Sequence, residues 1–391
     1  MKKVFPLLKG IAVFFEKNMN QLFSVSVEAQ QRILNSFENP KDDIERSYFQ
    51  YCCQIRMNKR IVNIMWNLAS FLIYFFVRKK LITAANPPAT VIHSRAVFFA
   101  DEPSKNLVPK EVADEYGEIQ ITGEFPKARL READVVFLNS IRKRYPRDWY
   151  FALKLMLKIS QFRGIMDAFK PECILTCSEY SFTSSILHEY CSMEGVRIVN
   201  VQHGEKFYFI RDAFFHFDKC YLWSDYYVDM MKSLRAEESQ FCVSVPQALV
   251  FPEEILALRH ITFDYTYYLQ EETTKELAVI KDSLLFLQKQ GITVCLRPHP
   301  VFSNKEKIRR IFSEFEIQDN FDVSIEKSLM MTKYAVSAYS AVLKQALYNG
   351  VGVVVDDISN PSRYRKLKEY RYEILDNTHS LLSEILRGKQ C

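Results

Sequence analysis

A chain of 391 residues with 48% hydrophobic and 25% charged residues is typical of a folded globular protein, and its length predicts two domains. The net charge of +5, from 52 basic and 47 acidic side chains, does not indicate nucleic acid binding. Only 10 glycines are present, which argues against repeats and glycine-rich phosphate loops. The nine cysteines include no CxxC pair, as is typical of a reducing, cytoplasmic compartment.

Residues 1–84 predict a helical extension, because apolar residues recur at helical spacing and Gly10 is their only glycine. Charged residues interrupt the apolar positions near the start, and no small-residue cleavage site follows, so we expect no secretory signal. The most apolar part, residues 61–77, lies between Arg60 and the basic trio Arg78–Lys80. Three alternatives fit this part: a buried helix, a helix on an anionic membrane surface, and a short transmembrane span.

A break at Asn86–Pro88 separates this extension from a region of short apolar runs followed by polar turns. The runs that we interpret as strand-like are 91–99, 117–121, 135–138, 173–177, 196–201 and 220–223. The helices predicted in the same region are 149–169, 184–193 and 225–234. Residues 173–201 therefore predict a complete βαβ unit.

The pattern loosens around residues 245–254, where Pro246 and Pro252 indicate a domain boundary. The strands predicted beyond it are 261–268, 292–296, 334–337 and 351–355. The helices predicted beyond it are 271–290, 305–315, 340–349, 362–369 and 378–386. Strands that alternate with helices predict parallel α/β sheets. We expect two facing Rossmann-like domains, 85–245 and 246–391, with a cleft between them and the helical extension 1–84 before them.

The segment Arg297–Pro300 (RPHP) directly follows a predicted buried strand. His299 is a candidate hydrogen-bond donor to a phosphate, or proton donor to a leaving oxygen, and Arg297 is a candidate bidentate phosphate ligand. Ser337 and Ser340 precede a predicted helix, where an N-cap hydroxyl and the helix dipole favour an anion. The alternatives are a histidine satisfied by the backbone of its turn and a serine that only caps a helix.

The segment Gln202–Gly204 (QHG) ends a strand of the first half, and we expect His203 to line the cleft with His299. Glu205 and Glu179 are the carboxylates nearest to this rim. Each is a candidate general base for an acceptor hydroxyl, with a solvated turn residue as the alternative. The chain has no convincing HxxxH or DxD motif, so we predict no metal held by the protein.

These motifs, in their order and spacing, resemble bacterial surface-polysaccharide transferases of the GT-B fold over about residues 90–380. The nearest groups are the capsule sialyl- and Kdo-transferases and the CDP-glycerol glycerophosphotransferases. The resemblance implies a GT-B-like α/β fold in which His299, Ser337 and Ser340 hold the phosphate of the donor nucleotide. The chain departs from the pattern in two ways: it lacks an acidic pair before glycine upstream of RPHP, and its serines are not adjacent.

The motifs and the resemblance together predict a cytoplasmic glycosyltransferase of capsular polysaccharide or lipopolysaccharide biosynthesis. A nucleotide-activated sugar, with CMP-linked sugars among the candidates, is the expected donor substrate, and no separate cofactor is expected. The expected acceptor is a polysaccharide or a lipid-linked glycan, with contact to the inner face of the cytoplasmic membrane as an open alternative. The other functions that remain open are transfer of glycerol or ribitol phosphate from a CDP donor, epimerisation of a sugar nucleotide, and non-catalytic assembly.

Overall fold

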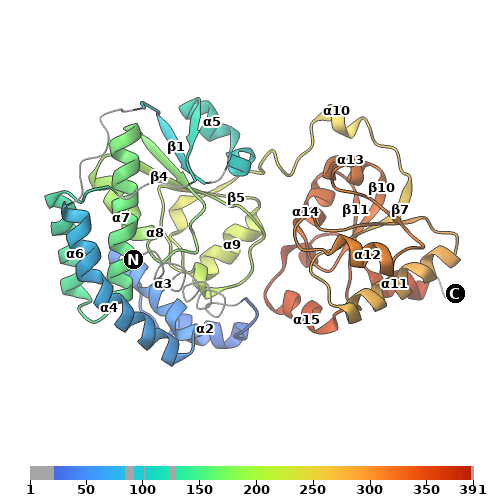
Figure 1. Cartoon of the computed structure of the whole chain (residues 1–391), viewed down its shortest axis with the longest axis horizontal. Helices are drawn as coiled ribbons and strands as arrows, with labels where there is room; N and C mark the ends of the chain where they lie inside the picture. The colour runs from blue at the N-terminus through green and yellow to red at the C-terminus, as the bar shows by residue number, and fades with distance from the viewer. Residues whose placement is uncertain (1–21, 84–91, 101, 124–127, 389–391) are drawn as a thin grey trace. The chain divides into compact units, whose positions relative to one another are not determined.

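The computed structural model describes residues 22–83, 92–100, 102–123 and 128–388, and the predictions for residues 1–21 and 84–91 lie outside these ranges. The chain divides into two compact units, each described by itself below (Figure 1). The first unit comprises the chain up to His203 together with Tyr208–Val245. The second unit comprises Gly204–Phe207 and Pro246–Cys391.

The first unit is built on a six-stranded sheet in which every paired strand is parallel to its neighbour. Its strands are β1 (Ala96–Phe99), β2 (Ile119–Ile121), β3 (Cys173–Thr176), β4 (Arg197–Val201), β5 (Lys219–Leu222) and β6 (Phe241–Val243). The strand order is β2-β1-β3-β4-β5-β6, so the direction of winding reverses between β1 and β3. In open α/β sheets, ligands bind outside the carboxyl ends of the strands at such a reversal.

The helices of the first unit include the N-terminal ones, which are integral to it. They are α2 (Val27–Asn35), α3 (Asp43–Met57), α4 (Arg60–Thr83), α5 (Lys110–Tyr116), α6 (Glu132–Arg144), α7 (Trp149–Phe169), α8 (Ser184–Met193) and α9 (Asp225–Ser233), with 3-10 turns at Glu102–Leu107, Ile210–Asp212 and Glu238–Gln240. Buried polar side chains join the N-terminal helices to the sheet unit: Ser47 accepts from the N–H of Ile186, and Gln50 donates to the carbonyl of Glu179. Helix α4 runs beside α7 (Figure 1).

The second unit contains another six-stranded sheet with parallel pairing throughout. Its strands are β7 (Phe263–Tyr268), β8 (Val294–Arg297), β9 (Glu316–Ile317), β10 (Thr332–Ser337), β11 (Gly352–Val355) and β12 (Ser380–Leu381). The order is β12-β11-β10-β7-β8-β9, so the winding reverses between β7 and β10. Gly352 permits this packing, because a Cβ there would lie 2.3 Å from the ring of Tyr334 on β10.

The helices of the second unit cover this sheet. They are α10 (Glu253–Leu256), α11 (Thr274–Lys289), α12 (Lys305–Ile311), α13 (Ile325–Met330), α14 (Ala341–Tyr348), α15 (Pro361–Glu369) and α16 (Leu382–Gly388), with a 3-10 turn at Glu373–Asp376. Helix α11 begins at a capping box formed by Thr273 and Glu276. It buries a helically spaced apolar stripe against the sheet: Leu277, Ile280, Leu284 and Leu287.

The predicted fold class is confirmed: the chain is α/β and GT-B-like, with two parallel Rossmann-like sheets and a helical N-terminal region. One predicted strand is wrong, because residues 135–138 lie inside helix α6. The residues that α6 buries, Asp134, Phe137, Leu138 and Ile141, follow helical spacing over a longer window than four residues. The helix predicted at 378–386 begins later, because Ser380 and Leu381 first pair with β11.

Candidate functional site

Ser337 and Ser340 lie where the winding of the second sheet reverses, at the carboxyl end of β10. Ser337 is fully buried, and its hydroxyl donates to the carbonyl of Tyr268 at the end of β7, at 2.9 Å. Ser340 caps α14, and its Oγ accepts from the N–H of Val342 at 3.2 Å and from Nε2 of Gln270 at 3.0 Å. Ser337 therefore ties two strand ends together, while Ser340 presents a hydroxyl whose proton neither of these two bonds uses.

His299 lies in the turn after β8, the strand next to β7, and its hydrogen bonds fix its tautomer. Its Nδ1 accepts from the N–H groups of Val301 and Phe302, at 3.1 and 3.2 Å. An imidazole that accepts at Nδ1 carries its proton on Nε2. Burial lowers the pKa of His299 below its ordinary value, which favours the neutral ring. His299 is thus set as a neutral hydrogen-bond donor through Nε2.

A short hydrogen-bonded network, which we call the serine–histidine network, joins His299 to Ser340. The backbone N–H of His299 donates to Oγ of Ser303, and that hydroxyl donates to the backbone carbonyl of Gln270. The side-chain amide of Gln270 then donates to Oγ of Ser340. Gln270 and Ser303 were not predicted from the sequence. Gln270 is the first polar residue after the apolar end of β7, which is the signal that places it at the strand-end edge.

Arg297 lies under the same edge and is only 6% exposed. Its Nη2 donates to the carbonyl of Val323 at 2.8 Å, whereas its Nη1 is buried without a hydrogen-bond partner among the described residues. Burial lowers the pKa of the guanidinium. A buried donor that lacks a partner is costly, and an anion is the natural partner for a guanidinium N–H. Nη2 of Arg297 therefore stabilises the fold, whereas Nη1 is chemically suited to bind an anion.

Glu272 is a further titratable group of this edge that the sequence did not reveal. Both of its carboxylate oxygens accept from the N–H of Gln270, at 2.8 and 2.9 Å. Burial raises the pKa of Glu272 to about 7, in spite of these hydrogen bonds. The protonation of Glu272 is therefore coupled to the loop that carries Gln270 and, through it, to Ser340.

Glu205 belongs to the second unit rather than to the first, in which the motif was expected to act. Burial, Glu373 and then Glu205 raise the pKa of Tyr348 to about 12. In the same short segment, the ring of Phe207 stacks on Tyr372 with centroids 5.6 Å apart, and Tyr372 Oη accepts from the N–H of Ser340 at 3.4 Å. Glu205 thus lies near α14, whose last residue is Tyr348.

His203 and Glu179 come together in the first unit, at the carboxyl ends of β4 and β3. Nδ1 of His203 lies 3.8 Å from Oε1 of Glu179, and the His203 side chain is 43% exposed. Glu179 is fully buried, which contradicts the alternative of a solvated turn residue. Asn200 orients the carboxylate by donating to its Oε2 at 3.0 Å. A buried carboxylate behind a half-exposed imidazole is an arrangement that suits a general base.

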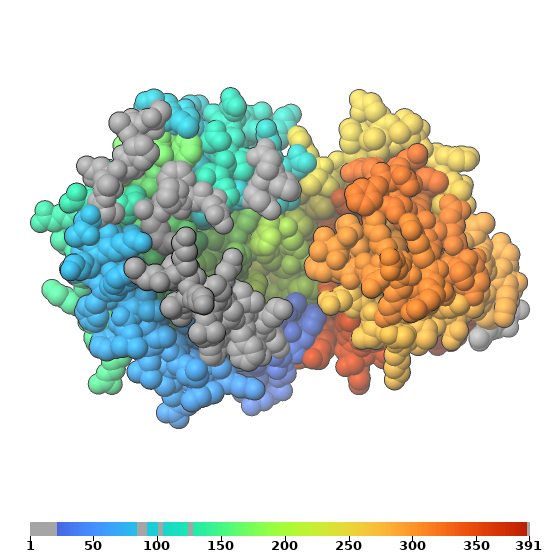
Figure 2. Space-filling model, in the orientation of Figure 1, coloured from blue at the N-terminus to red at the C-terminus, as the bar shows by residue number. Residues whose placement is uncertain are grey.

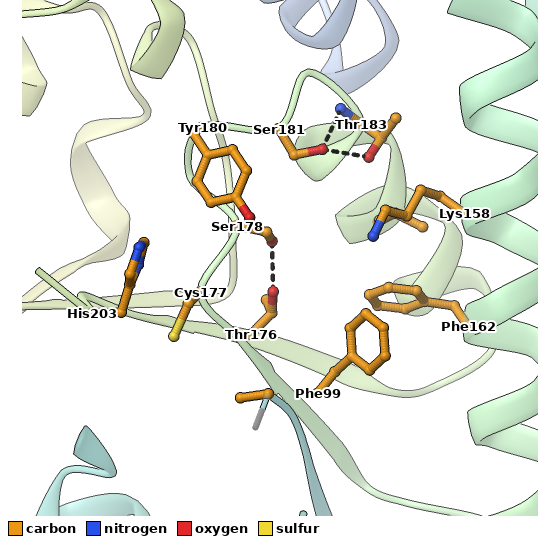
Figure 3. Close-up of a pocket in the computed structure, with 12 residues that line it drawn as sticks. Phe99, Lys158, Phe162, Thr176, Cys177, Ser178, Tyr180, Ser181, Thr183 and His203 are labelled. Atoms are coloured by element: carbon orange, nitrogen blue, oxygen red, sulfur yellow. Dashed lines mark hydrogen bonds between the residues drawn. The ribbon is translucent and has the colours of Figure 1, made fainter. Parts of the chain in front are cut away.

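His203 also lines a pocket of about 230 Å³ at the winding reversal of the first sheet (Figure 3). The pocket walls come from the ends of β1, β3 and β4 and from α7 and α8: Phe99, Ala100, Lys158, Phe162, Thr176, Cys177, Ser178, Tyr180, Ser181, Thr183, Leu187 and His203. The rings of Phe99 and Phe162 form an apolar wall opposite a group of hydroxyls (Figure 3). Aromatic faces combined with hydroxyl donors and acceptors suit a ligand that carries both C–H faces and hydroxyl groups.

A separate cluster of Asp43, His188 and His216 is the group of potential metal ligands found among the described residues. Nδ1 of His188 and Nδ1 of His216 lie 2.6 and 2.7 Å from the two oxygens of Asp43. Ligand atoms of one tetrahedral zinc ion, with bonds of about 2.0 Å, lie about 3.3 Å apart. The shorter separations are those of imidazole N–H groups that donate to a carboxylate, so the cluster has the geometry of a partly buried ion pair.

The pKa values in this cluster favour its charged form. Burial opposes the charge on Asp43, but hydrogen bonds from His188 and His216 outweigh it and lower the pKa of Asp43 to about 2. Burial also opposes the charge on His188, yet Asp218 and Asp43 raise the pKa of His188 to about 9. These side chains connect α3 to α8 and to the segment before β5, and their role is therefore to hold the N-terminal helices in place.

No known family model matches the sequence, and no curated protein matches it. Solved structures that align with it include the UDP-GlcNAc 2-epimerase of Methanocaldococcus jannaschii, at 9% identity and a TM-score of 0.44 over 75% of this chain and 91% of that one. MnaA of S. aureus aligns at 11% identity with a TM-score of 0.42, over 75% of this chain and 89% of that one. The wall teichoic acid polymerase TagF aligns at 11% identity with a TM-score of 0.43, over 85% of this chain and 88% of that one. Likeness at this level describes no more than general architecture.

Proposed function

We propose that this protein is a cytoplasmic glycosyltransferase that uses a nucleotide-activated sugar in capsular polysaccharide or lipopolysaccharide biosynthesis. The observation that carries the proposal is the serine–histidine network, which joins the backbone of the His299 turn to the capped N-terminus of α14 at one strand-end edge. Such an edge combines a ring N–H, a hydroxyl and the positive end of a helix dipole, all of which favour a phosphate. The second unit is therefore assigned the donor nucleotide.

Within this proposal, the donor phosphate accepts hydrogen bonds from Nε2 of His299 and from the hydroxyl of Ser340. Arg297 Nη1 is a third donor to that phosphate, because it is buried and has no protein partner among the described residues. Ser337 acts through the backbone, since its hydroxyl is committed to Tyr268. These contacts stabilise the charge that develops on the leaving nucleotide.

The first unit is assigned the acceptor, a polysaccharide or lipid-linked glycan. The pocket with aromatic and hydroxyl walls matches the mixed surface of a sugar ring, and His203 with Glu179 behind it is the proposed general base. The acceptor oxygen forms a bond to the anomeric carbon of the donor, and the bond from that carbon to the phosphate oxygen breaks. The acceptor proton moves to Nε2 of His203, and the nucleotide leaves with the electron pair.

Calorimetric titration of the full chain with CMP, CDP and UDP tests the donor assignment. Each contact to a charged phosphate contributes about 1.5–3 kcal/mol, so His299→Ala is expected to weaken nucleotide binding at least about tenfold, and Gln270→Ala, which acts only through Ser340, is expected to weaken it less. Gln270→Ala breaks the network without removing the serine cap of α14. Ser313→Ala is the matched control, because this exposed serine donates to its neighbour Glu314 and takes no part in the network. A wild-type chain that binds none of the three nucleotides would contradict the proposal.

Transfer of a polyol phosphate from a CDP donor is the second candidate, since a pocket of about 230 Å³ admits a glycerol or ribitol chain as well as a sugar ring. The two reactions differ in their products. In sugar transfer all of the donor's phosphate leaves with the nucleotide and none reaches the acceptor. In polyol-phosphate transfer CMP leaves and one phosphate of the donor is added to the acceptor. Phosphorus analysis of the elongated acceptor separates them, and turnover of a sugar nucleotide to its epimer without any acceptor would favour an epimerase instead.

A further inference from the structure

Helix α4 (Arg60–Thr83) presents a broad apolar face to the outside of the first unit. Leu72 is 74% exposed and Phe76 is 72% exposed. Further large apolar side chains of this helix are at least 41% exposed: Ile61, Ile64, Met65, Leu68, Phe71, Ile73 and Phe75. The helix belongs to the blue part of the surface in Figure 2. Its 18-residue apolar window has a mean hydropathy of 1.5 and is only 11% buried. Exposed apolar patches of this extent are typical of interaction surfaces.

The uncharged polar side chains Asn63, Asn67 and Ser70 of α4 point the opposite way, toward the protein. Asn67 donates to the carbonyl of Arg147 at 2.8 Å and accepts from the N–H of Tyr150 at 3.1 Å. Asn63 donates to the carbonyl of Ile55 at 2.6 Å, and Ser70 is 2% exposed. A helix that meets water has its polar stripe outside and its apolar stripe inside. Helix α4 has the reverse order, which indicates that its outer face contacts an apolar medium.

Contacts at both ends of α4 hold it along the first unit and decide between the alternatives left open by the sequence. Asn63 and Asn67 fasten its first half, and the carbonyl of Leu81 accepts from the N–H of Leu130 at 3.1 Å in its last turn. The helix also packs along α7, most of whose residues are buried in the first unit. A transmembrane span has lipid or other spanning segments around it for its whole length. Helix α4 therefore lies on a surface and does not cross it.

The charges of α4 indicate the composition of that surface. The helix contains no acidic residue, Arg60 begins it, and Arg78, Lys79 and Lys80 stand near its end. Lys79 follows Leu72 by about two helical turns and is therefore on the same exposed face. Cζ of Arg142 in helix α6 lies 3.5 Å from the ring centroid of Trp149. The rings of Trp149 and Phe71 pack together with their centroids 4.8 Å apart. Basic residues and tryptophan beside an apolar face are the composition of an interfacial helix on anionic lipid.

We propose that α4 docks the protein on an anionic membrane surface, lying parallel to it with the exposed apolar face in the headgroup–acyl boundary. The three lysine and arginine side chains near its C-terminal end contact anionic headgroups. This surface is independent of the nucleotide-binding and acceptor-binding assignments. It also brings a lipid-linked substrate and the enzyme to the same two-dimensional surface.

Co-sedimentation of the full chain with phosphatidylcholine vesicles, with and without phosphatidylglycerol, tests the proposal. The wild type is expected to bind the anionic vesicles at least about tenfold more tightly than the neutral ones. The double variant Leu72→Ser, Phe76→Ser is expected to lose at least about tenfold in affinity for both. Phe321→Ser is the matched control, because Phe321 is 92% exposed in the second unit and is expected to leave binding unchanged.

Charge reversal with Lys79→Glu, Lys80→Glu is expected to abolish the preference for anionic vesicles and to keep the weak binding to neutral ones. Circular dichroism of each variant checks that the fold is retained, which the exposure of all four positions favours. Equal vesicle binding by the wild type and the Leu72→Ser, Phe76→Ser variant would overturn the proposal. A wild-type chain that dimerises without lipid, with a Leu72→Ser, Phe76→Ser variant that is monomeric, would overturn the proposal in favour of self-association. Membrane-bound protein that resists extraction with alkaline carbonate would overturn it in favour of a transmembrane span.

Discussion

Two regions of this protein, the cluster of Asp43, His188 and His216 in the first unit and the strand-end edge of the second, hold their titratable groups in opposite ways. In the first unit, Asp43 and His188 form a partly buried ion pair, with pKa values shifted to about 2 and about 9, so both are charged near neutral pH. At the strand-end edge of the second unit, burial lowers the pKa of His299 and raises the pKa of Glu272 to about 7. Charge thus stabilises the cluster around Asp43, whereas His299 and Glu272 at the strand-end edge are kept close to neutrality.

This difference has a physical meaning for binding. A buried ion pair is satisfied internally and gains nothing from a ligand. A desolvated edge with oriented donors, among them the buried guanidinium of Arg297, carries an electrostatic cost that an incoming anion relieves. The second unit is therefore the one expected to respond to nucleotide. In the first unit the pair of His203 and Glu179 is different from both, since one partner is exposed and the other fully buried.

The largest effect is expected at His203, because it is the proposed base. His203→Ala is expected to lower the rate of transfer about 10³-fold while nucleotide binding stays unchanged. Glu179→Gln retains the shape of the side chain but removes the charge behind the imidazole, and it is expected to flatten the pH–rate profile as well as slow transfer. Rates are measured with acceptor in excess, and a His203→Ala chain with the wild-type rate would refute the base assignment.

A smaller effect, on stability, is expected from Asp43→Asn. This change removes one of the two carboxylates that face protonated His188, leaving Asp218, and is expected to cost about 2 kcal/mol of unfolding free energy near pH 6. The contribution of His188 is complete below its unfolded pKa of about 6.5 and is lost as the pH rises through about 9. The contribution of Asp43 is lost only as the pH falls through about 2.

Urea unfolding of wild type and Asp43→Asn at several pH values measures this difference. It is expected to be largest between about pH 4 and 6.5 and to narrow toward pH 9. Glu28→Gln serves as the control, because Glu28 pairs with Arg32 at a fully solvated position and its removal is expected to change little. Equal stabilities of wild type and Asp43→Asn at pH 6 would show that the ion pair does not hold α3.

The smallest effect, and one of opposite sign, is expected from Glu272→Gln. The folded pKa of Glu272, about 7, lies above the unfolded value, so the folded state loses stability as the pH rises from about 4.5 to 7. Removing the titrating group is expected to increase stability by about 1 kcal/mol at pH 8 and to leave it unchanged at pH 4. A parallel pH dependence in Glu272→Gln and wild type would mean that Glu272 is not the titrating group.

Local sequence patterns were sufficient for the elements that carry their own signals. Helices α7 and α8 begin and end at the predicted residues, and Ser340 caps α14. The prediction of a strand at 135–138 was wrong, because a segment of four apolar residues is too short to show whether its periodicity is that of a strand or of a buried helix. The short edge strands β9 and β12 were missed, since two residues have no periodicity and form only against a neighbouring strand.

The sequence by itself determined the α/β alternation, the turn around His299 and the serine cap of α14, because these depend on residues close together in the chain. Only the tertiary structure decided which side chains meet. The strand order places Gln270 against Ser340, the burial of Glu179 puts it behind His203, and the packing on α7 turns the asparagines of α4 inward. Each of these contacts joins residues far apart in the chain. Their partners are set by sheet register and helix orientation, which no local pattern specifies.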